Sequence, residues 1–445
     1  MTSVAIVGGG PAGIAAGHAL HRAGVPFELF DAGPPLPGRR HDRAQDLGVG
    51  VGGAGLFSDG KFSFFPSGTH LYTLPDRVRL KAAFGAVAEM LACAGIGAPA
   101  FPDDDSTADA AAAGPFRQKA YPSLYGSLEQ RIRLAHELTA GYAARIRSFC
   151  TVEDLSGAPG EYRIRYRNEA GRLSSEAFTH VVIATGRFGA LGSLLENALP
   201  LEEQRYEVGI RIEHPNEVGF LRTSSSPDVK LIMEGRQAEV RTFCTCRNGE
   251  VWLIPYDPVS ALSGRSDGPP SGYSNFGLLP RFSGPSRRTG RAIWQHFWSR
   301  SANSRTALWQ PLPEFLNGTL DARTAPPDGR PWHPREDFVR GDIARALHPE
   351  LRDTLTASLR AMVECFPDMG GRETICLFPA VEGVGRFPAS GGELRMGSEA
   401  AWVCGDVVGR FRGLVPALVS GHYVGRAVAA HVSERRLEVT GEPAE

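Results

Sequence analysis

Long apolar runs, an excess of one charge and an even number of cysteines are all missing from this chain of 445 residues. No apolar stretch reaches the length of a transmembrane helix, so we expect no membrane span. The formal net charge of −1 gives no electrostatic reason to expect nucleic acid or an anionic membrane as a partner. The hydrophobic fraction of 42% is ordinary for a globular protein, and the length favours two domains over one.

The cysteines and the first residues bear on where the protein works. The seven cysteines are scattered and odd in number, which suits reduced thiols better than a disulfide framework. No basic segment stands ahead of a long apolar one at the start, so we expect no signal peptide. These two observations together predict a cytoplasmic location.

The first 31 residues carry the pattern of a dinucleotide-binding βαβ unit. Residues 4–7 (VAIV) predict a buried strand, and residues 14–22 predict a helix. Residues 8–13 (GGGPAG) lie between them, and a second strand at 27–30 (FELF) ends in Asp31. A glycine-rich turn in some other α/β protein would explain the glycines but would leave Asp31 unexplained.

Each glycine of this unit, and Asp31 after it, has a physical role. Gly8 allows the tight turn, Gly10 lets the backbone approach a pyrophosphate, and Gly13 lets the helix pack close to the strand. The helix N-terminus offers free N–H groups to the anion, and Asp31 is placed to accept hydrogen bonds from a ribose. The cofactor contacts predicted here are Gly8, Gly10, Pro11, Ala12, Gly13 and Asp31.

Two later strands end in residues of the same kind. A buried strand at 181–184 closes on Thr185-Gly186, and another at 401–404 closes on Gly405-Asp406. Gly413-Leu414 then begins a helix of small residues that we expect over 415–431. Three strand ends of this type in one chain are typical of a flavin-binding Rossmann domain.

The fold class that follows is α/β, with a Rossmann-like FAD-binding domain built from discontinuous segments and an inserted α+β substrate or cap domain. Two helical patterns flank a surface loop at 103–113, and a three-stranded meander is expected over 146–178. The predicted boundaries are 1–75, 143–204 and 373–435 for the FAD-binding domain, 76–142 for a helical insertion, 205–372 for the substrate domain and 436–445 for a C-terminal tail.

On these motifs the chain resembles the glutathione-reductase-type FAD oxidoreductases, and more narrowly the FAD-dependent dehydrogenase group. The narrower match rests on residues 52–61 (GGAGLFSDGK), 208–215, 239–246 (EVRTFCTC) and 382–421. One departure is visible at 247–249 (RNG), where a Pro-Gly-Gly-like turn is expected. The resemblance implies bound FAD and redox chemistry, and it does not imply a substrate.

Candidate site residues follow from the resemblance and from the strand ends. Further FAD contacts are expected at Gly53, Ala54, Gly55, Val152, Thr185, Gly186, Gly405, Asp406, Gly413 and Leu414. The catalytic candidates are Lys61, which would place a cation near the reduced flavin, and Arg412, whose planar fork suits a substrate carboxylate. Against these stand plainer alternatives, in which Lys61 reaches solvent and Arg412 pairs with nearby acids.

Other residues leave alternatives open. In an extended strand the Cα atoms of Cys244 and Cys246 lie about 6.5 Å apart, near the upper limit for a disulfide, which favours a packing role over a redox pair. No second ligand pair at zinc spacing accompanies them, so we expect no metal. His214 and His422 are acid/base candidates that more often prove structural. The basic run 39–43 contacts phosphates or is solvated.

The leading function is an FAD-dependent oxidoreductase that moves a hydride or two electrons between a small organic molecule and flavin N5. The chain has no second GxGxxG after a strand, which favours a diffusible donor or acceptor such as NADPH or NADH, or reoxidation by O₂. An FAD monooxygenase or oxidase of the same fold is the alternative. A binding protein without catalysis is a third possibility, and the sequence leaves the oligomeric state open.

Overall fold

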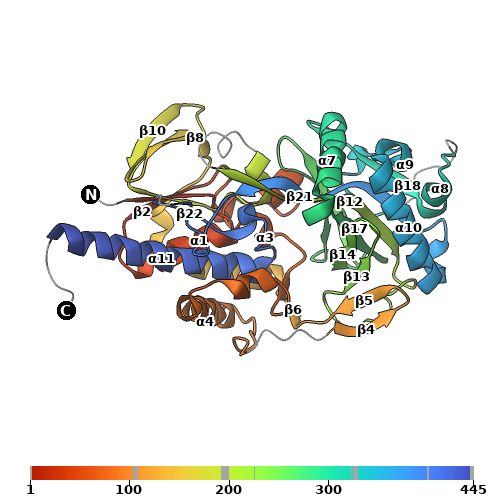
Figure 1. Cartoon of the computed structure of the whole chain (residues 1–445), viewed down its shortest axis with the longest axis horizontal. Coiled ribbons are helices and arrows are strands. Elements are labelled where there is room, and N and C mark those ends of the chain that lie inside the picture. Colours follow the sequence, from red (N-terminus) through yellow and green to blue (C-terminus); the bar gives the residue numbers. More distant parts are fainter. Residues whose placement is uncertain are drawn as a thin grey trace.

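Two large sheets organise the chain, one on the left and one on the right of Figure 1. The computed structural model describes residues 3–103, 109–191, 200–224, 226–321, 323, 329–397 and 400–440. The left sheet is parallel, with five strands in the order β22-β11-β1-β2-β7. Its strands are β1 (Val4–Val7), β2 (Phe27–Phe30), β7 (Ile146–Arg147), β11 (His180–Ile183) and β22 (Ala401–Val403).

The parallel sheet is built from strands that lie far apart in the sequence. Its central strands are apolar on both faces. β1 and β11 are buried along their whole length, as expected for a parallel sheet covered on both sides. Helix α1 (Pro11–Arg22) connects β1 to β2. The meander predicted next is confirmed, with β8 (Thr151–Ala158), β9 (Glu161–Arg167) and β10 (Leu173–Phe178) paired antiparallel.

Helix α11 (Leu414–Thr440) packs alongside α1 in the part of the molecule that holds the parallel sheet (Figure 1). The two helices approach closely at glycines, since a Cβ at Gly421 would stand 2.0 Å from the carbonyl oxygen of Ala12. The helix was expected to end at residue 431, but it continues to Thr440, so the predicted tail at 436–445 is helical in its first half. Residues 441–445 lie outside the described residues.

The second sheet has nine strands in the order β20-β18-β21-β12-β17-β14-β13-β5-β4. Its bounds are β4 (Asp109–Ala113), β5 (Phe116–Lys119), β12 (Leu201–Pro215), β13 (Lys230–Glu234), β14 (Glu239–Cys246), β17 (Tyr273–Arg281), β18 (Ala307–Pro311), β20 (Phe338–Arg340) and β21 (Ile375–Pro388). The long strands β12 and β21 pair antiparallel at its middle. The predicted start of the last cofactor segment at 373 is therefore wrong, because residues 375–388 belong to this sheet.

The expected helical insertion at 76–142 is also wrong in its middle. Helices α4 (Arg77–Cys93) and α5 (Leu128–Thr139) form where predicted, but the alanine run that was expected in a surface loop is strand β4. The β4–β5 hairpin joins the edge of the nine-stranded sheet, where β5 pairs antiparallel with β13. The alanine strand β4 pairs with its neighbour β5, and β5 pairs with a strand more than a hundred residues away, so sheet pairing overrides the weak local preference of alanine.

Smaller elements complete the described fold. Two small sheets hold β15 (Glu250–Pro255), β16 (Ser260–Arg265) and β19 (Trp332–His333), and β3 (Lys61–Ser63) with β6 (Ser123–Tyr125). The remaining helices are α2 (Ala44–Gly48), α3 (Gly53–Leu56), α7 (Arg287–Ser301), α8 (Leu312–Asn317), α9 (Ile343–Ala346) and α10 (Pro349–Cys365). The predicted α/β class, with a Rossmann-like sheet from discontinuous segments and an inserted second part, is confirmed.

Short 3₁₀ turns link these elements. They are η1 (Leu36–Gly38), η2 (Thr69–Thr73), η3 (Ala140–Arg145), η4 (Arg187–Leu191), η5 (Gly284–Ser286), η6 (Arg335–Asp337), η7 (Pro367–Gly370) and η8 (Gly405–Val408). Among the described helices, none combines the length and the apolar character that a membrane crossing requires.

Candidate functional site

Two glycines of the first turn leave no room for a side chain. Gly8 has a φ of +104°, and a Cβ there would lie 2.5 Å from the carbonyl oxygen of Ala184. A Cβ at Gly13 would lie 1.8 Å from the carbonyl oxygen of Gly8, which packs the helix against the turn. The geometry therefore requires glycine at both positions, as the sequence pattern predicts.

The N-terminus of α1 is open to a ligand anion. Its N-cap is Gly10, no side chain caps it, and the first turn, which begins with Pro11, holds no acidic residue. Helix N-terminal N–H groups without an internal partner attract anions, and the helix dipole adds to that attraction. The open N–H groups come from the stretch that contains Ala12 and Gly13.

The glycine-rich loop before α3 lies directly against this helix start. Gly52 N donates to Gly9 O at 2.8 Å, and a Cβ at Gly53 would stand 2.7 Å from Gly10 Cα. Gly55 is equally crowded, since its Cβ would meet the Leu414 side chain at 2.5 Å. The structure thus brings the predicted residues 53–55 and the start of α11 together at one place.

Asp31 is bonded to the turn itself. Its carboxylate accepts hydrogen bonds from Gly9 N at 2.7 Å and from Gly33 N at 2.9 Å. Burial raises the pKa of Asp31, and these two N–H donors oppose the rise. A carboxylate has about four acceptor positions, and the Gly50 N–H also approaches Asp31, so one position remains for a ligand hydroxyl. Val152 lies half-buried on β8, two residues after Cys150 N, which donates to Asp31 O at 2.8 Å.

Two buried oxygens at neighbouring strand ends have no partner. Thr185 Oγ1 follows β11, and Asp406 Oδ1 follows β22, which pairs with β11. Both atoms are shut off from solvent, and neither has a hydrogen-bond partner within the described parts of the chain. An unsatisfied buried polar atom costs about 1–3 kcal/mol, so such atoms in a native fold point to a missing ligand or water. Gly186 follows Thr185 with a φ of +73°.

The strand end at Asp406 lies next to the first helix. A Cβ at Gly405 would lie 2.6 Å from the Ala12 side chain, and Gly405 N donates to Ser420 Oγ at 3.0 Å. Gly413, with a φ of +98°, then turns the chain into α11. The parts of the predicted cofactor site at the two helix starts and at β22 are therefore contiguous.

Arg412 is surrounded by carboxylates. Its guanidinium pairs with Glu382, approaches Asp406 Oδ2 at 3.5 Å, and lies 3.8 Å from Glu207 Oε2. Burial lowers the pKa of Arg412, as does the neighbouring Arg187, while Glu207 raises it. The alternative in which Arg412 pairs with acids of this protein describes its contacts, and these acids leave less of its fork for a substrate.

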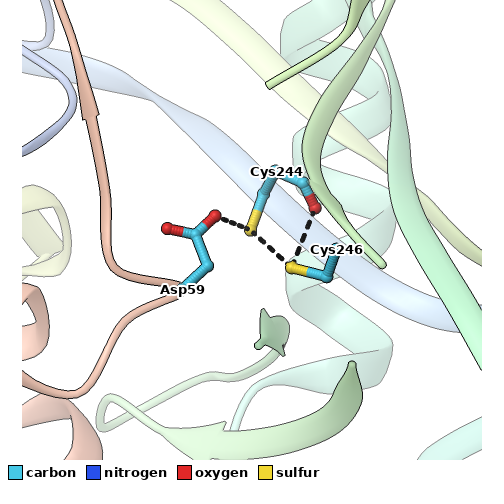
Figure 2. Close-up of side chains that lie close together, drawn as sticks. All are labelled: Asp59, Cys244 and Cys246. Atoms are coloured by element: carbon cyan, nitrogen blue, oxygen red, sulfur yellow. Dashed lines mark hydrogen bonds between the residues drawn. The ribbon is translucent and has the colours of Figure 1, made fainter. Parts of the chain in front are cut away.

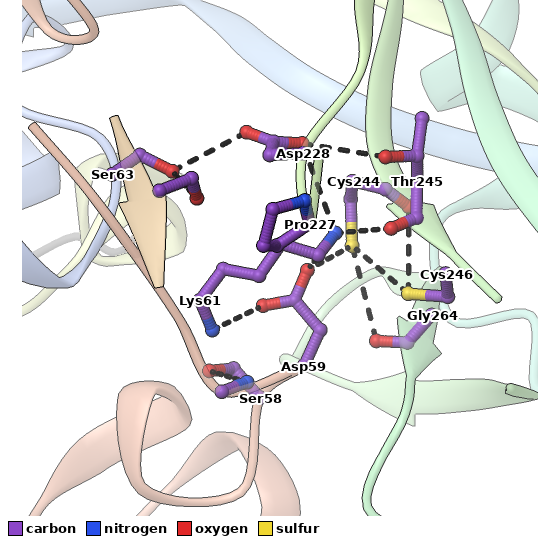
Figure 3. A network of polar contacts seen from close by, with 12 residues as sticks. Ser58, Asp59, Lys61, Ser63, Pro227, Asp228, Cys244, Thr245, Cys246 and Gly264 are labelled. Carbon is purple, nitrogen blue, oxygen red and sulfur yellow. Dashed lines mark hydrogen bonds and ion pairs between the residues drawn. The ribbon is translucent and has the colours of Figure 1, made fainter. Parts of the chain in front are cut away.

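Lys61 is buried within a polar network at the boundary between the two sheets (Figure 3). Its side chain is 4% exposed, its ammonium lies 2.9 Å from Asp59 Oδ2 and 3.7 Å from Asp228 Oδ1, and it donates to Thr245 O. Burial lowers the pKa of Lys61, but Asp59 and other acidic neighbours raise it well above the usual value. The alternative in which Lys61 reaches solvent is wrong, because carboxylates on two separate segments hold it inside.

Cys244 and Cys246 join the same network (Figure 2). Their Sγ atoms are 4.0 Å apart, and Cys244 Sγ donates to Asp59 Oδ2 at 3.3 Å. The expectation of a regular extended strand is wrong here, because Cys244 has a φ of +48° and the pairing of β14 with β17 shifts its register at this point. Asp228 lies just before β13 and Arg211 lies on β12, and no local sequence signal marks either residue for this role.

The basic run at 39–43 divides in two. Arg39 is buried and holds the glycine-rich loop by donating to Gly53 O at 2.7 Å and Val51 O at 3.1 Å. Arg40 is exposed and pairs with Asp42 at 2.7 Å. The solvated interpretation therefore fits Arg40 and fails for Arg39.

Neither histidine candidate lies at this site. His214 is buried, with Nδ1 2.8 Å from its neighbour Pro215 O. His422 is buried in α11, with its ring 5.8 Å from that of His18. Burial lowers the pKa of His422 to about 3, and His18 adds to the effect, so the ring is neutral near pH 7.

Replacing His422 with glutamine should flatten the acid side of the stability curve. The folded-state pKa of about 3 lies below the unfolded value of 6.5, so the unfolded state takes up the proton first as the pH falls. The wild type should lose about 2 kcal/mol relative to the variant between pH 7 and pH 5. Urea unfolding of both proteins at the two pH values measures this, and an unchanged difference would contradict the neutral, buried ring.

Comparisons with known proteins agree with the first part of this site. Residues 6–73 match the family model described as an NAD(P)-binding Rossmann-like domain, which confirms the predicted dinucleotide-binding fold there. No curated protein matches the chain.

Several solved structures match most of this chain with low TM-scores. One is CabE, an aromatic hydroxylase from angucycline biosynthesis, at 14% identity and a TM-score of 0.42, over 98% of this chain and 63% of that one. Another is a flavoprotein/dehydrogenase from Cytophaga hutchinsonii, at 10% identity and 0.40, over 100% and 80%. A third is a geranylgeranyl bacteriochlorophyll reductase-like protein from Thermoplasma acidophilum, at 14% and 0.40, over 98% and 80%. This chain spans less than two thirds of the hydroxylase, and TM-scores below 0.5 assign it no reaction.

Proposed function

We propose that this protein is an FAD-dependent oxidoreductase. The observation that carries the proposal is the pair of unpartnered buried oxygens, Thr185 Oγ1 and Asp406 Oδ1, at neighbouring strand ends beside an uncapped helix N-terminus. A dinucleotide supplies hydroxyl donors for such oxygens and a pyrophosphate for the helix. A flavin adds the redox chemistry, since it exchanges a hydride or two electrons with a substrate when it is bound.

The residues present fit that cofactor in order along the site. In this proposal the turn from Gly8 to Gly13 holds the pyrophosphate, Asp31 and the nearby Val152 contact the adenosine end, and the loop 53–55 covers the middle. Asp406 receives the ribityl hydroxyls, with Thr185-Gly186 beside it. Gly413 and Leu414 present the N-terminal end of α11, whose dipole favours negative charge on the flavin pyrimidine.

The catalytic candidates act through their neighbours in this proposal. Arg412 orients Asp406, whose other oxygen it approaches at 3.5 Å, and so positions a cofactor contact. Lys61 neutralises Asp59 and holds the loop that follows Gly55 against the nine-stranded sheet. Both residues are therefore positioning residues, with the hydride chemistry left to the cofactor.

We assign substrate binding to the second sheet. Residues 1–75, 143–200 and the part of 373–435 beyond β21 would form the cofactor domain, and 201–388 the substrate domain. The boundary predicted at 204 moves to 200 because β12 of the nine-stranded sheet begins at Leu201. A small organic molecule then meets the flavin at the boundary between the sheets, and the dehydrogenase or reductase reaction uses a diffusible NADPH or NADH as the second partner. Analysis of the product formed under labelled O₂ tests this, because incorporated label would show a monooxygenase instead.

Replacing Asp406 with asparagine should weaken FAD binding. Loss of a hydrogen bond to a charged group costs about 1.5–3 kcal/mol, which corresponds to a Kd roughly 10- to 100-fold higher. Fluorescence titration of the apoprotein with FAD measures this. The matched control is Asp42→Asn, whose carboxylate is 55% exposed and pairs only with Arg40 in the hydrogen bonds described, and it should bind FAD like the wild type. Equal Kd values for both variants would remove Asp406 from the cofactor site.

A further inference from the structure

The backbone at Cys244 brings two thiols together that a regular strand would hold apart. Cys244 adopts a φ of +48°, and the register of β14 against β17 shifts between Phe243 and Cys246. As a result the two sulfur atoms lie 4.0 Å apart (Figure 2). Side-chain rotation then needs to close only the distance from this contact to a disulfide bond of about 2.05 Å.

The charges around the pair favour a thiolate. Lys61 lies in the same network, and Arg211 Nη2 is 3.8 Å from Cys246 Sγ and 2.7 Å from Cys244 O (Figure 3 shows the Lys61 side). Burial raises the pKa of the Cys246 thiol, while the contact with Cys244 Sγ and the charge of Lys61 lower it below its usual value. A thiolate is the reactive form in disulfide chemistry.

The proton of the second thiol has an acceptor in place. Cys244 Sγ donates to Asp59 Oδ2 at 3.3 Å, and burial and hydrogen bonding raise the pKa of Cys244 well above its usual value. Cys244 therefore keeps its proton until the sulfur is oxidised, and Asp59 then lies on the path by which the proton leaves.

The same three groups could be taken for a metal site, since Asp59, Cys244 and Cys246 each offer a ligand atom within 4.8 Å of the others. Two fixed cations argue against it. The Lys61 ammonium pairs with Asp59 Oδ2, the same oxygen that accepts from Cys244 Sγ. The Arg211 guanidinium contacts Cys246 Sγ. A divalent ion would sit within a few ångströms of both positive charges, which repel it in a buried setting.

The pair is connected to the proposed cofactor site through Asp59, which accepts from Cys244 Sγ and follows the glycine-rich loop that packs on the start of α1. Burial raises the pKa of the Tyr256 phenol, Arg187 lowers it, and the charges of Cys244 and Asp406 raise it further. The Tyr256 ring also stacks on Phe188, three residues after Thr185, with centroids 4.3 Å apart.

We propose that Cys244 and Cys246 are a redox-active pair that exchanges two electrons with the flavin, an inference that rests on the proposed function. In the forward direction, the Cys246 thiolate and the Cys244 thiol become a disulfide, with loss of two electrons and the Cys244 proton. The oxidised flavin takes up both electrons and one proton, and the reverse step restores the thiolate, the thiol and the oxidised flavin.

An anaerobic dithionite titration of the purified holoprotein tests the pair. Flavin and disulfide are each two-electron couples, so the air-oxidised wild type should take up about four electrons per FAD. Cys244→Ser and Cys246→Ser should each take up about two. The control Cys93→Ser, at an exposed cysteine, should still take up about four. Alkylation and peptide mass spectrometry of the wild type should find both thiols blocked before reduction and free afterwards.

The outcomes separate the pair from the flavin. A wild type whose flavin bleaches after about two electrons, with both thiols alkylated beforehand, would overturn the redox pair and leave the proposed function standing. Thiols that become free only after a chelator removes stoichiometric zinc would overturn it in favour of a metal site. A protein that neither contains nor takes up FAD would overturn the proposed function and this electron transfer with it.

Discussion

Alanine at Gly13 is expected to leave the protein without bound FAD. The added Cβ would stand 1.8 Å from the carbonyl oxygen of Gly8, a backbone atom that cannot rotate away. Either α1 moves off the strand or the turn opens, and both displace the N–H groups that we assign to the pyrophosphate. Overpacking of this kind costs about 1–3 kcal/mol, so FAD affinity should fall by about 5- to 150-fold.

The measurement is FAD content after purification, followed by fluorescence titration of the apoprotein. Gly85→Ala is the matched control, because Gly85 also lies inside a helix but a Cβ there meets nothing within 4 Å. Alanine in a helix interior is preferred over glycine by about 1 kcal/mol, so this control should keep its FAD and gain stability. Wild-type FAD affinity in Gly13→Ala would contradict the placement of the cofactor at this turn.

Methionine at Lys61 should destabilise the protein more than any surface charge change. The substitution removes the ammonium group that lies between Asp59 and Asp228, so both carboxylates lose this cation. The lysine side chain is only 4% exposed at this site. Breaking a buried ion pair by removing one partner costs about 3–5 kcal/mol. Urea unfolding should therefore show a lower midpoint with an unchanged slope.

Two further variants separate the buried charge from a general effect of the substitution. Arg40→Met removes an exposed cation that pairs with Asp42, and it should leave the unfolding midpoint unchanged. The double variant Lys61→Met with Asp59→Asn should be less destabilised than the sum of its single changes, because the unpaired charge is gone as well. Strict additivity, or a stable Lys61→Met protein, would contradict the buried ion pair.

The cofactor half of the site can be predicted from the local sequence, because steric limits at its turn allow only certain residues. Gly8 and Gly13 touch backbone atoms, and only glycine fits there, so their spacing carries the geometry directly. The short apolar strands at 181–183 and 401–403 are buried and pair in parallel, and the residues after them lie at the carboxyl ends of the strands.

The second half depends on contacts between distant segments. The segment 109–119 forms a β-hairpin because its strand β5 pairs with the distant strand β13. The alanine run by itself does not predict this pairing. Residues 375–388 belong to the second sheet and not to the cofactor domain, because β21 pairs along its length with β12. Cys244 and Cys246 meet because of a positive φ and a register shift. Asp59 and Lys61 reach them from one distant segment and Arg211 from another.

The absorption spectrum of the purified protein, recorded before and after anaerobic NADPH and then in air, tests the central claim most directly. We expect the spectrum of oxidised flavin, its bleaching on reduction by NADPH or by an oxidisable substrate, and its return with oxygen. A colourless protein that takes up no added FAD would contradict the flavoenzyme and leave the fold without a redox role.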